Sequence, residues 1–245
     1  MSKLGEAIGV LKEKGPVSLF KKGLKYTLLD ALEIPSAIKR AREKKSLVET
    51  LEFAYSGILF PYQVRSEMSG LLSVLKRRTI RNMLEIGTAG GGSLYLFSKI
   101  SKNDATLISL DQPGWLLGEG YPPWRIPLYK SFACGSQKVV LLRGDSHDKN
   151  MLDKVKKTLH GNALDFLFID GDHSYSGVKN DFEMYSPLVE KRGLVAIHDI
   201  CGDHETCHVK RFWEEIKKKH STEEIIKDRK QVWAGIGLVY LNGKT

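Results

Sequence analysis

The chain has 245 residues, a hydrophobic fraction of 42% and a formal net charge of +9. This hydrophobic fraction supports a sizeable core and argues against global disorder. The sequence has no apolar run near the roughly 18 uninterrupted residues of a membrane helix, and its start lacks the apolar centre of a signal peptide. Three cysteines do not make a disulfide framework for a chain of this length, so we expect a reducing, cytoplasmic setting.

The positive charge is concentrated near the amino terminus. Residues 1–50 hold eleven Lys and Arg against six acids. Such a segment could bind an acidic partner, such as a nucleic acid, an anionic membrane surface or a phosphorylated substrate, but a solvated helical face is the favoured explanation of the charge. Nucleic acid is the weakest of these partners, because basic and aromatic residues do not interleave along one platform. A peripheral membrane contact and a homodimer contact stay open for this segment.

The first part of the chain, residues 1–78, is expected to be a helical extension or lid. One amphipathic stretch begins near Leu28 and is expected to be interrupted by Pro35, and another spans residues 48–53. A longer helix is predicted over residues 63–77, where apolar side chains recur at helical spacing.

Residues 79–245 are predicted to form an α/β domain. Strands are expected at residues 83–86, 105–110, 139–142, 166–169, 194–197, 223–226 and 237–241. Helices are expected at residues 93–100, 149–159, 175–189 and 209–219. Strands that alternate with helix-length segments predict a parallel, doubly wound sheet.

Ionisable side chains stand where two of these strands end. Asp170-Gly171-Asp172-His173 follows the fourth strand, and His198-Asp199 follows the fifth. Ligands in open parallel sheets bind outside the carboxyl ends of the strands, so these groups form a candidate active site. The carboxylates are numerous enough to hold a hard divalent cation.

A glycine loop, EIGTAGGGS from Glu85 to Ser93, follows the first strand. Ala89 replaces the middle glycine of a dinucleotide fingerprint, and Ser93 replaces the lysine of a phosphate loop. The loop instead resembles motif I of class I S-adenosylmethionine (SAM)-dependent methyltransferases, E/D-x-G-x-x-x-G. This resemblance implies a Rossmann-like, seven-stranded sheet that is mostly parallel, with the last strand antiparallel.

The same resemblance implies a set of residues that bind SAM. The motif positions are Glu85, Gly87 and Gly91, and Thr88 and Ser93 belong to the same loop. Asp111 ends the second strand, where the family's acid binds the ribose hydroxyls, and a carboxylate can accept hydrogen bonds from both. Asp145 and Ser146 stand at the adenine position after the third strand, and Asp170 adds to the set.

The segment FIDGDHSYSGVKNDFEMY, followed by GLVAIHDI, resembles a subgroup of sugar and macrolide O-methyltransferases and cephalosporin-hydroxylase-like proteins. The resemblance extends from about residue 63 to the end. It implies a divalent cation, usually magnesium, held by Asp170, His198 and Asp199. His198 stands where relatives mostly carry an acid, which makes manganese, iron or zinc more plausible and also admits a site without metal.

Two neighbours of Asp170 are candidates for the general base. The family layout favours Asp172, whereas a pKa near neutrality favours His173. Asp181, farther along the next helix, is expected to be structural and to face solvent or pair locally.

Two further segments carry candidate side chains. Cys201, His204, Cys207 and His208 are soft ligands at a density that could bind zinc, but their spacing favours a mobile loop over the active site. Between Asp111 and the third strand, four aromatic residues could stack on an acceptor, and Arg125 and Lys130 could pair with its anionic group. The same aromatics could simply pack against the fold.

The leading hypothesis is a cation-assisted O-methyltransferase acting on a small-molecule or glycosyl substrate. Asp170-Gly171-Asp172-His173 replaces the N/D-P-P-Y/F tetrapeptide of base-amino methyltransferases, which argues for oxygen as the acceptor. One alternative is a cephalosporin-hydroxylase-like enzyme with iron at Asp170, His198 and Asp199. Another is an RNA-binding methyltransferase-like module.

Overall fold

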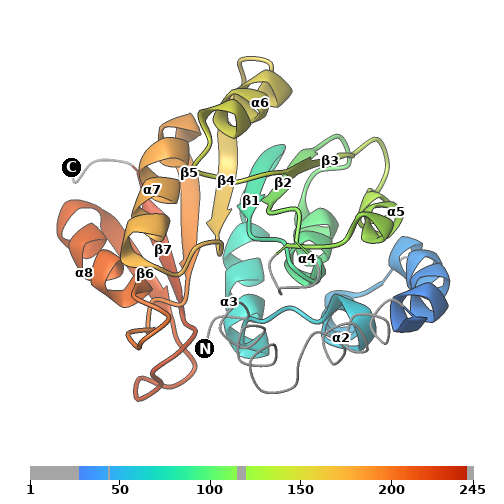
Figure 1. Ribbon diagram of the computed structural model, residues 1–245, viewed down its shortest axis with the longest axis horizontal. Coiled ribbons are helices and arrows are strands. Elements are labelled where there is room, and N and C mark those ends of the chain that lie inside the picture. Colours follow the sequence, from blue (N-terminus) through green and yellow to red (C-terminus); the bar gives the residue numbers. More distant parts are fainter. Residues whose placement is uncertain (1–27, 44, 115–119, 242–245) are drawn as a thin grey trace, which may run out of the picture.

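The computed structural model describes residues 28–43, 45–114 and 120–241 (Figure 1). Its seven strands form one sheet in the order β3-β2-β1-β4-β5-β7-β6. The strands are β1 Asn82–Ile86, β2 Thr106–Asp111, β3 Lys138–Arg143, β4 Leu164–Ile169, β5 Val189–His198, β6 Ser221–Ile225 and β7 Ile236–Tyr240.

Strand direction in this sheet follows a simple division. The neighbours from β3 to β5 all pair in parallel. β7 pairs antiparallel with both β5 and β6, and its first residue, Ile236, lies opposite His198. This topology confirms the predicted Rossmann-like sheet with its antiparallel last strand.

The helices cover both faces of the sheet (Figure 1). They are α2 Leu47–Ala54, α3 Arg65–Leu75, α4 Gly92–Ile100, α5 Ile126–Lys130, α6 Lys149–Leu159, α7 Tyr175–Tyr185 and α8 Val209–Lys219, with 3-10 turns η1 Gly57–Leu59, η2 Pro123–Arg125 and η3 Ser186–Leu188. Side chains of α2 to α5 pack with Phe166 and Phe168, whereas α6, α7 and α8 pack with Leu167 and Ile169. Successive strand residues point to opposite faces, so burial on both faces explains why the central strands are continuous apolar runs.

The amino-terminal helix differs from the prediction. It is helical over residues 28–42 and passes through Pro35, which was expected to interrupt it. Packing explains the difference, because Ala37 and Ala41 of this helix are buried in the same core as α2, α3 and α4. The leucines at the start of this amphipathic stretch are exposed: Leu28 57%, Leu29 40% and Leu32 78%. The division into residues 1–78 and 79–245 stays a prediction.

The connection after α7 also differs. The helix expected to reach residue 189 ends at Tyr185 and continues as η3, and β5 begins at Val189. Pro187 lies in η3, and a proline cannot donate the backbone hydrogen bond that would continue an α-helix.

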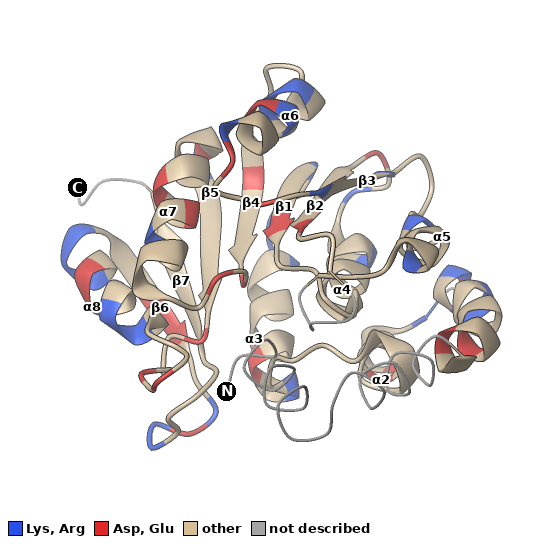
Figure 2. Cartoon of the chain, in the orientation of Figure 1, with Lys and Arg blue, Asp and Glu red and all other residues tan. Residues whose placement is uncertain are grey.

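Basic side chains gather on the outer helices α6 and α8 (Figure 2). Lys156 and Lys157 lie in the last turn of α6, and Lys217, Lys218 and Lys219 lie in the last turn of α8. Positive charge at the carboxyl end of a helix interacts favourably with the helix dipole and stabilises the helix, which gives these lysines a structural role. Most of the basic amino-terminal segment lies outside the described residues. Across the described part of the chain, no helix has the length and apolar character needed to span a membrane.

A buried ion pair attaches the amino-terminal helix to the rest of the fold. Arg125 donates from Nη2 to Oδ1 of Asp30 over 2.6 Å and from Nε to Oδ2 over 2.8 Å, and both side chains are largely buried. We predict that Asp30→Asn lowers the free energy of unfolding by about 3 kcal/mol, because it leaves the guanidinium without its counter-charge. Urea denaturation measures this change.

The matched control is Asp104→Asn. Asp104 faces Arg81 at 3.7 Å with both side chains exposed, so its loss should cost less than about 1 kcal/mol. Equal effects of the two substitutions would contradict a special role for the Asp30 pair.

Candidate active site

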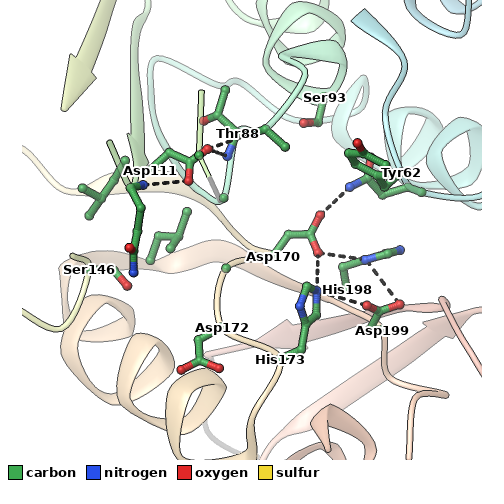
Figure 3. Close-up of a pocket in the computed structure, with 18 of the residues that line it drawn as sticks. Tyr62, Thr88, Ser93, Asp111, Ser146, Asp170, Asp172, His173, His198 and Asp199 are labelled. Atoms are coloured by element: carbon green, nitrogen blue, oxygen red, sulfur yellow. Dashed lines mark hydrogen bonds and ion pairs between the residues drawn. The ribbon is translucent and has the colours of Figure 1, made fainter. Parts of the chain in front are cut away.

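A cavity of about 720 Å³ lies at the carboxyl ends of the parallel strands. Most residues predicted for the site line it: Gly87, Thr88, Ser93, Asp111, Asp145, Ser146, Asp170, Asp172, His173, His198 and Asp199. Two predicted residues, Glu85 and Gly91, do not line it. Figure 3 shows Asp111 and Ser146 toward one end of the cavity, Tyr62, His198 and Asp199 toward the other, and Asp170 between them.

The glycine loop approaches the end of β4 closely. Gly87 has a φ of 87°, and a Cβ there would lie 2.1 Å from the carbonyl oxygen of Asp170. Gly91 has a φ of 84° and is the N-cap of α4, where a Cβ would lie 2.5 Å from the Tyr129 ring. Glycine is the residue that satisfies both demands. Gly91 therefore allows the loop to pack against Tyr129, and Gly87 allows the loop to approach Asp170 at the cavity.

Asp111 anchors the glycine loop. Its Oδ2 accepts hydrogen bonds from the backbone N–H of Thr88 at 3.0 Å and of Ala89 at 2.7 Å, and its Oδ1 accepts one from Gln112 N–H at 2.7 Å. Burial raises the pKa of Asp111 despite these three bonds. A carboxylate has about four acceptor sites, so Oδ1 retains capacity for a ligand hydroxyl.

Glu85 lies beneath the loop. Its side chain is fully buried, and its Oε2 accepts a hydrogen bond from the Thr88 hydroxyl at 2.9 Å. Within the described residues, its Oε1 has no hydrogen-bond partner. Burial raises the pKa of Glu85 to about 8, which exceeds the lowering by the hydroxyls of Ser93 and Thr88. Glu85 thus carries a proton at neutral pH and supports the loop from below.

Four side chains form a tight ionisable cluster: Asp170, His173, His198 and Asp199. Each offers one ligand atom, and these atoms all lie within 4.8 Å of one another (Figure 3). His198 Nδ1 lies 2.9 Å from Asp170 Oδ1 and 3.5 Å from Asp199 Oδ1. His173 Nε2 lies 3.5 Å from Asp170 Oδ1 and 3.1 Å from Asp199 Oδ2.

The pKa values in the cluster follow from mutual pairing. Burial lowers the pKa of each histidine, but the two carboxylates outweigh it and raise the pKa of His173 to about 11 and of His198 to about 9. Burial raises the pKa of Asp170 and Asp199, but the charged histidines outweigh it and hold both below the usual range. The cluster therefore balances two carboxylates against two imidazolium groups.

The donor set of this cluster fits a divalent cation. Two carboxylates and two histidines converge within ligand range, and such mixed donors suit manganese, iron or zinc as well as magnesium. Cation binding would require the two histidines to release the protons that they hold in the metal-free cluster. The geometry adds His173, which was considered as a base, to the three predicted ligands. Asp172, the other candidate base, is exposed and lies apart from the cluster (Figure 3), and its Oδ1 accepts the Ser174 N–H at 2.8 Å.

The site contains two features that sequence reasoning did not assign. Gln63, which was expected only to begin a helix, donates from Nε2 to Asp170 Oδ2. Asp181 is fully buried, and its Oδ1 lies 3.3 Å from Nε2 of His147, which lines the cavity. A signal for Asp181 was present, because it falls between Val178 and Phe182 on the buried face of α7.

The described aromatic side chains of the segment before β3 do not line the cavity, which speaks against the hypothesis that they stack on an acceptor. Tyr121 and Tyr129 are buried in the core, although Gly120 and the backbone nearby approach the cavity. Arg125 pairs with Asp30, and Lys130 donates to the carbonyl oxygen of Val139. The aromatics therefore pack against the fold, which was the other hypothesis; Trp115 lies outside the described residues.

The candidate zinc loop does not gather its cysteines and histidines into a metal-binding group within the described residues. In the described part of the chain, neither cysteine belongs to the metal-binding group found at Asp170. His204, Thr206 and Cys207 line the cavity, so this loop forms part of its wall.

The chain is similar to known proteins in sequence and in fold. Residues 84–200, just under half of the chain, match a family model described as a methyltransferase domain. The chain is 34% identical over 116 residues to the uncharacterised protein R132 of Acanthamoeba polyphaga mimivirus, and this match covers 47% of the chain and 50% of R132. The chain thus spans about half the length of that curated relative.

Solved structures share the fold. The O-methyltransferase TomG from Streptomyces achromogenes, in complex with SAM, superposes with a TM-score of 0.57 at 15% identity over 89% of this chain and 98% of TomG. An O-methyltransferase from Bacillus cereus, in complex with SAH, gives 0.57 at 18% identity over 81% of this chain and 92% of that chain. The family match and the fold confirm the predicted class I methyltransferase resemblance.

We predict that Glu85→Gln changes how stability depends on pH. The side chain titrates near 4.5 when unfolded and at about 8 in the fold, so the native state binds an extra proton between these values. The contribution of Glu85 to the free energy of unfolding is therefore greatest below pH 4.5. It falls as pH rises, by up to about 1.4 kcal/mol per pH unit. Urea denaturation across pH 4.5 to 8 should show a shallower decline in the variant; parallel curves would contradict the buried, protonated Glu85.

Proposed function

Because residues 84–200 match a methyltransferase domain, we propose that this protein transfers a methyl group from SAM to a hydroxyl of a small-molecule or glycosyl acceptor, assisted by a divalent cation. One observation carries the proposal. A single cavity contains both the glycine loop with Asp111 and the cluster around Asp170, which are a cofactor end and a cation end.

The cofactor end is built from backbone and acids. The glycine loop leads into the amino terminus of α4, which favours negative charge, and Asp111 Oδ1 can accept a ribose hydroxyl. Asp145 and Ser146 line the same end and are proposed to contact adenine. The fold shared with proteins solved in complex with SAM and SAH supports this assignment.

The cation end is formed by Asp170, His198 and Asp199, with His173 as a fourth donor. Magnesium is the proposed cation, and the two imidazoles also admit manganese or iron. When bound, the cation would act as a Lewis acid that lowers the pKa of an acceptor hydroxyl. The protein's own contribution is to hold these donors in place and to orient the acceptor toward the cofactor end.

The acceptor's proton needs a base that reaches the cavity. Asp172 lines the cavity as an exposed carboxylate and is our proposed base. His173 is a weaker choice by geometry, because its Nε2 faces the carboxylates of Asp170 and Asp199.

A second candidate function rests on the same donor set. Two imidazoles with two carboxylates also suit iron, which favours a cephalosporin-hydroxylase-like enzyme on this fold. The two functions differ in what they consume: the methyltransferase converts SAM to its demethylated product, whereas a hydroxylase consumes dioxygen.

We predict that Asp170→Asn and Asp111→Ala separate the two ends of the cavity. Asp170→Asn should weaken manganese binding at least about 10-fold, because it removes a charged ligand, and should weaken SAM binding by less. Asp111→Ala should do the reverse, weakening SAM binding about 10-fold or more through a lost charge-assisted hydrogen bond. Calorimetric titration of each ligand into each variant measures both effects.

The control is Asp203→Asn, an exposed acid that pairs with His208 near the cavity wall. It should bind both ligands like the unmodified protein. Unchanged manganese affinity in Asp170→Asn would remove the cation from the proposal, and unchanged SAM affinity in Asp111→Ala would remove the ribose contact.

A further inference from the structure

Glu67 is a buried carboxylate outside the cavity. It lies in the first turn of α3, with 1% of its surface exposed. Its Oε1 accepts hydrogen bonds from Lys227 N–H at 2.9 Å and Gln231 Nε2 at 2.8 Å, and its Oε2 accepts one from Gly235 N–H at 2.9 Å. A buried charge is costly unless it is hydrogen-bonded, and all three bonds come from the connection between β6 and β7. Glu67 thus holds residues 227–235, here called the β6–β7 loop.

The β6–β7 loop contacts the cation end directly. Ala234 N–H donates to Asp199 Oδ1 at 2.8 Å, and the carbonyl oxygen of Ala234 accepts from Cys201 N–H at 2.9 Å. The loop also carries Trp233, which lines the cavity and is 54% exposed. The position of the Asp199 carboxylate therefore depends on the position of the Ala234 backbone.

The Ala234 backbone is held in an uncommon conformation. Ala234 has a φ of 58°, in the left-handed region that side chains other than glycine rarely adopt, and Gly235 follows at 82°. Such a conformation persists where the surrounding structure imposes it. The bond from Gly235 N–H to Glu67 supplies this constraint at the neighbouring residue.

The start of α3 reaches the other carboxylate of the cluster as well. Gln63, two residues before α3, donates from Nε2 to Asp170 Oδ2, and its carbonyl oxygen accepts from the Tyr55 hydroxyl at 3.0 Å. One short stretch of the amino-terminal part thus supports Asp170 directly and Asp199 through the loop.

We propose that Glu67 is a positioning residue: it holds the β6–β7 loop so that the Ala234 N–H orients the Asp199 carboxylate for a divalent cation and Trp233 stands at the cavity wall. This inference rests on the proposed cation site. Groups that orient the ligands of a metal typically change its affinity 10- to 100-fold when they are removed.

The first test is hydrogen exchange on Glu67→Gln without added metal. A glutamine has one carbonyl oxygen, so at least one loop donor faces an amide nitrogen and loses its acceptor. Exchange should accelerate in residues 199–202 and 227–235 and stay unchanged in β1 and β4. The control, Glu183→Gln, removes an exposed acid of α7 and should change neither region. Unchanged protection of the loop, or equal loosening of the whole sheet, would overturn the proposal.

The second test is calorimetric titration of manganese and, separately, of SAM. Glu67→Gln should weaken manganese binding on the order of 10-fold while SAM affinity changes less than about 2-fold. Glu67→Asp retains both acceptor oxygens and should recover part of the manganese affinity. Unchanged manganese affinity in Glu67→Gln would overturn the positioning role. If the unmodified protein binds no manganese, the cation site itself fails, and the exchange experiment alone decides whether Glu67 holds the loop.

Discussion

The charge of Asp170 is the constraint on which the site depends. This carboxylate is largely shielded from solvent, with 9% of its side chain exposed, at the end of β4, between β1 and β5 in the centre of the sheet. A buried charge destabilises the fold unless partners compensate it. His198 and His173 provide opposite charge and Gln63 provides a hydrogen bond, and these partners come from three separate segments of the chain. Because the charge of Asp170 requires these partners, the residues that form the cation end lie close together.

The topology of the sheet explains how one edge gathers the rest. Parallel pairing from β3 to β5 places the glycine loop, Asp111, Asp145 and the Asp170 cluster at the same edge. β7 runs in the opposite direction, so its first residue, Ile236, lies beside His198 at this edge. The reversal of the last strand thus delivers the β6–β7 loop to Asp199, where α3 holds it through Glu67. The amino-terminal part and the β6–β7 hairpin therefore contact each other next to the cation end.

Local pattern was sufficient to predict most of the fold. The apolar runs of β1, β2 and β4 predicted buried strands, and α8 begins and ends where its amphipathic spacing indicated. Pro35 misled the prediction, because burial of the helix around it outweighs the local cost of a proline. Asp170, His198 and Asp199 could be predicted together, since they follow adjacent parallel strands. Gln63 could not be assigned to Asp170, because 107 residues separate them and the contact depends on how α3 packs. Glu67 reads in the sequence as an ordinary acid in a first helical turn.

The most direct test of the account is calorimetric titration of SAM into metal-stripped protein, repeated in the presence of magnesium and of manganese. The account predicts saturable SAM binding in each case, because the glycine loop and Asp111 form the cofactor end without the cation. It also predicts a separate heat when either metal is added alone, from the Asp170 cluster. Absence of SAM binding under every condition would contradict the methyltransferase function, and SAM binding without any metal heat would contradict the cation site.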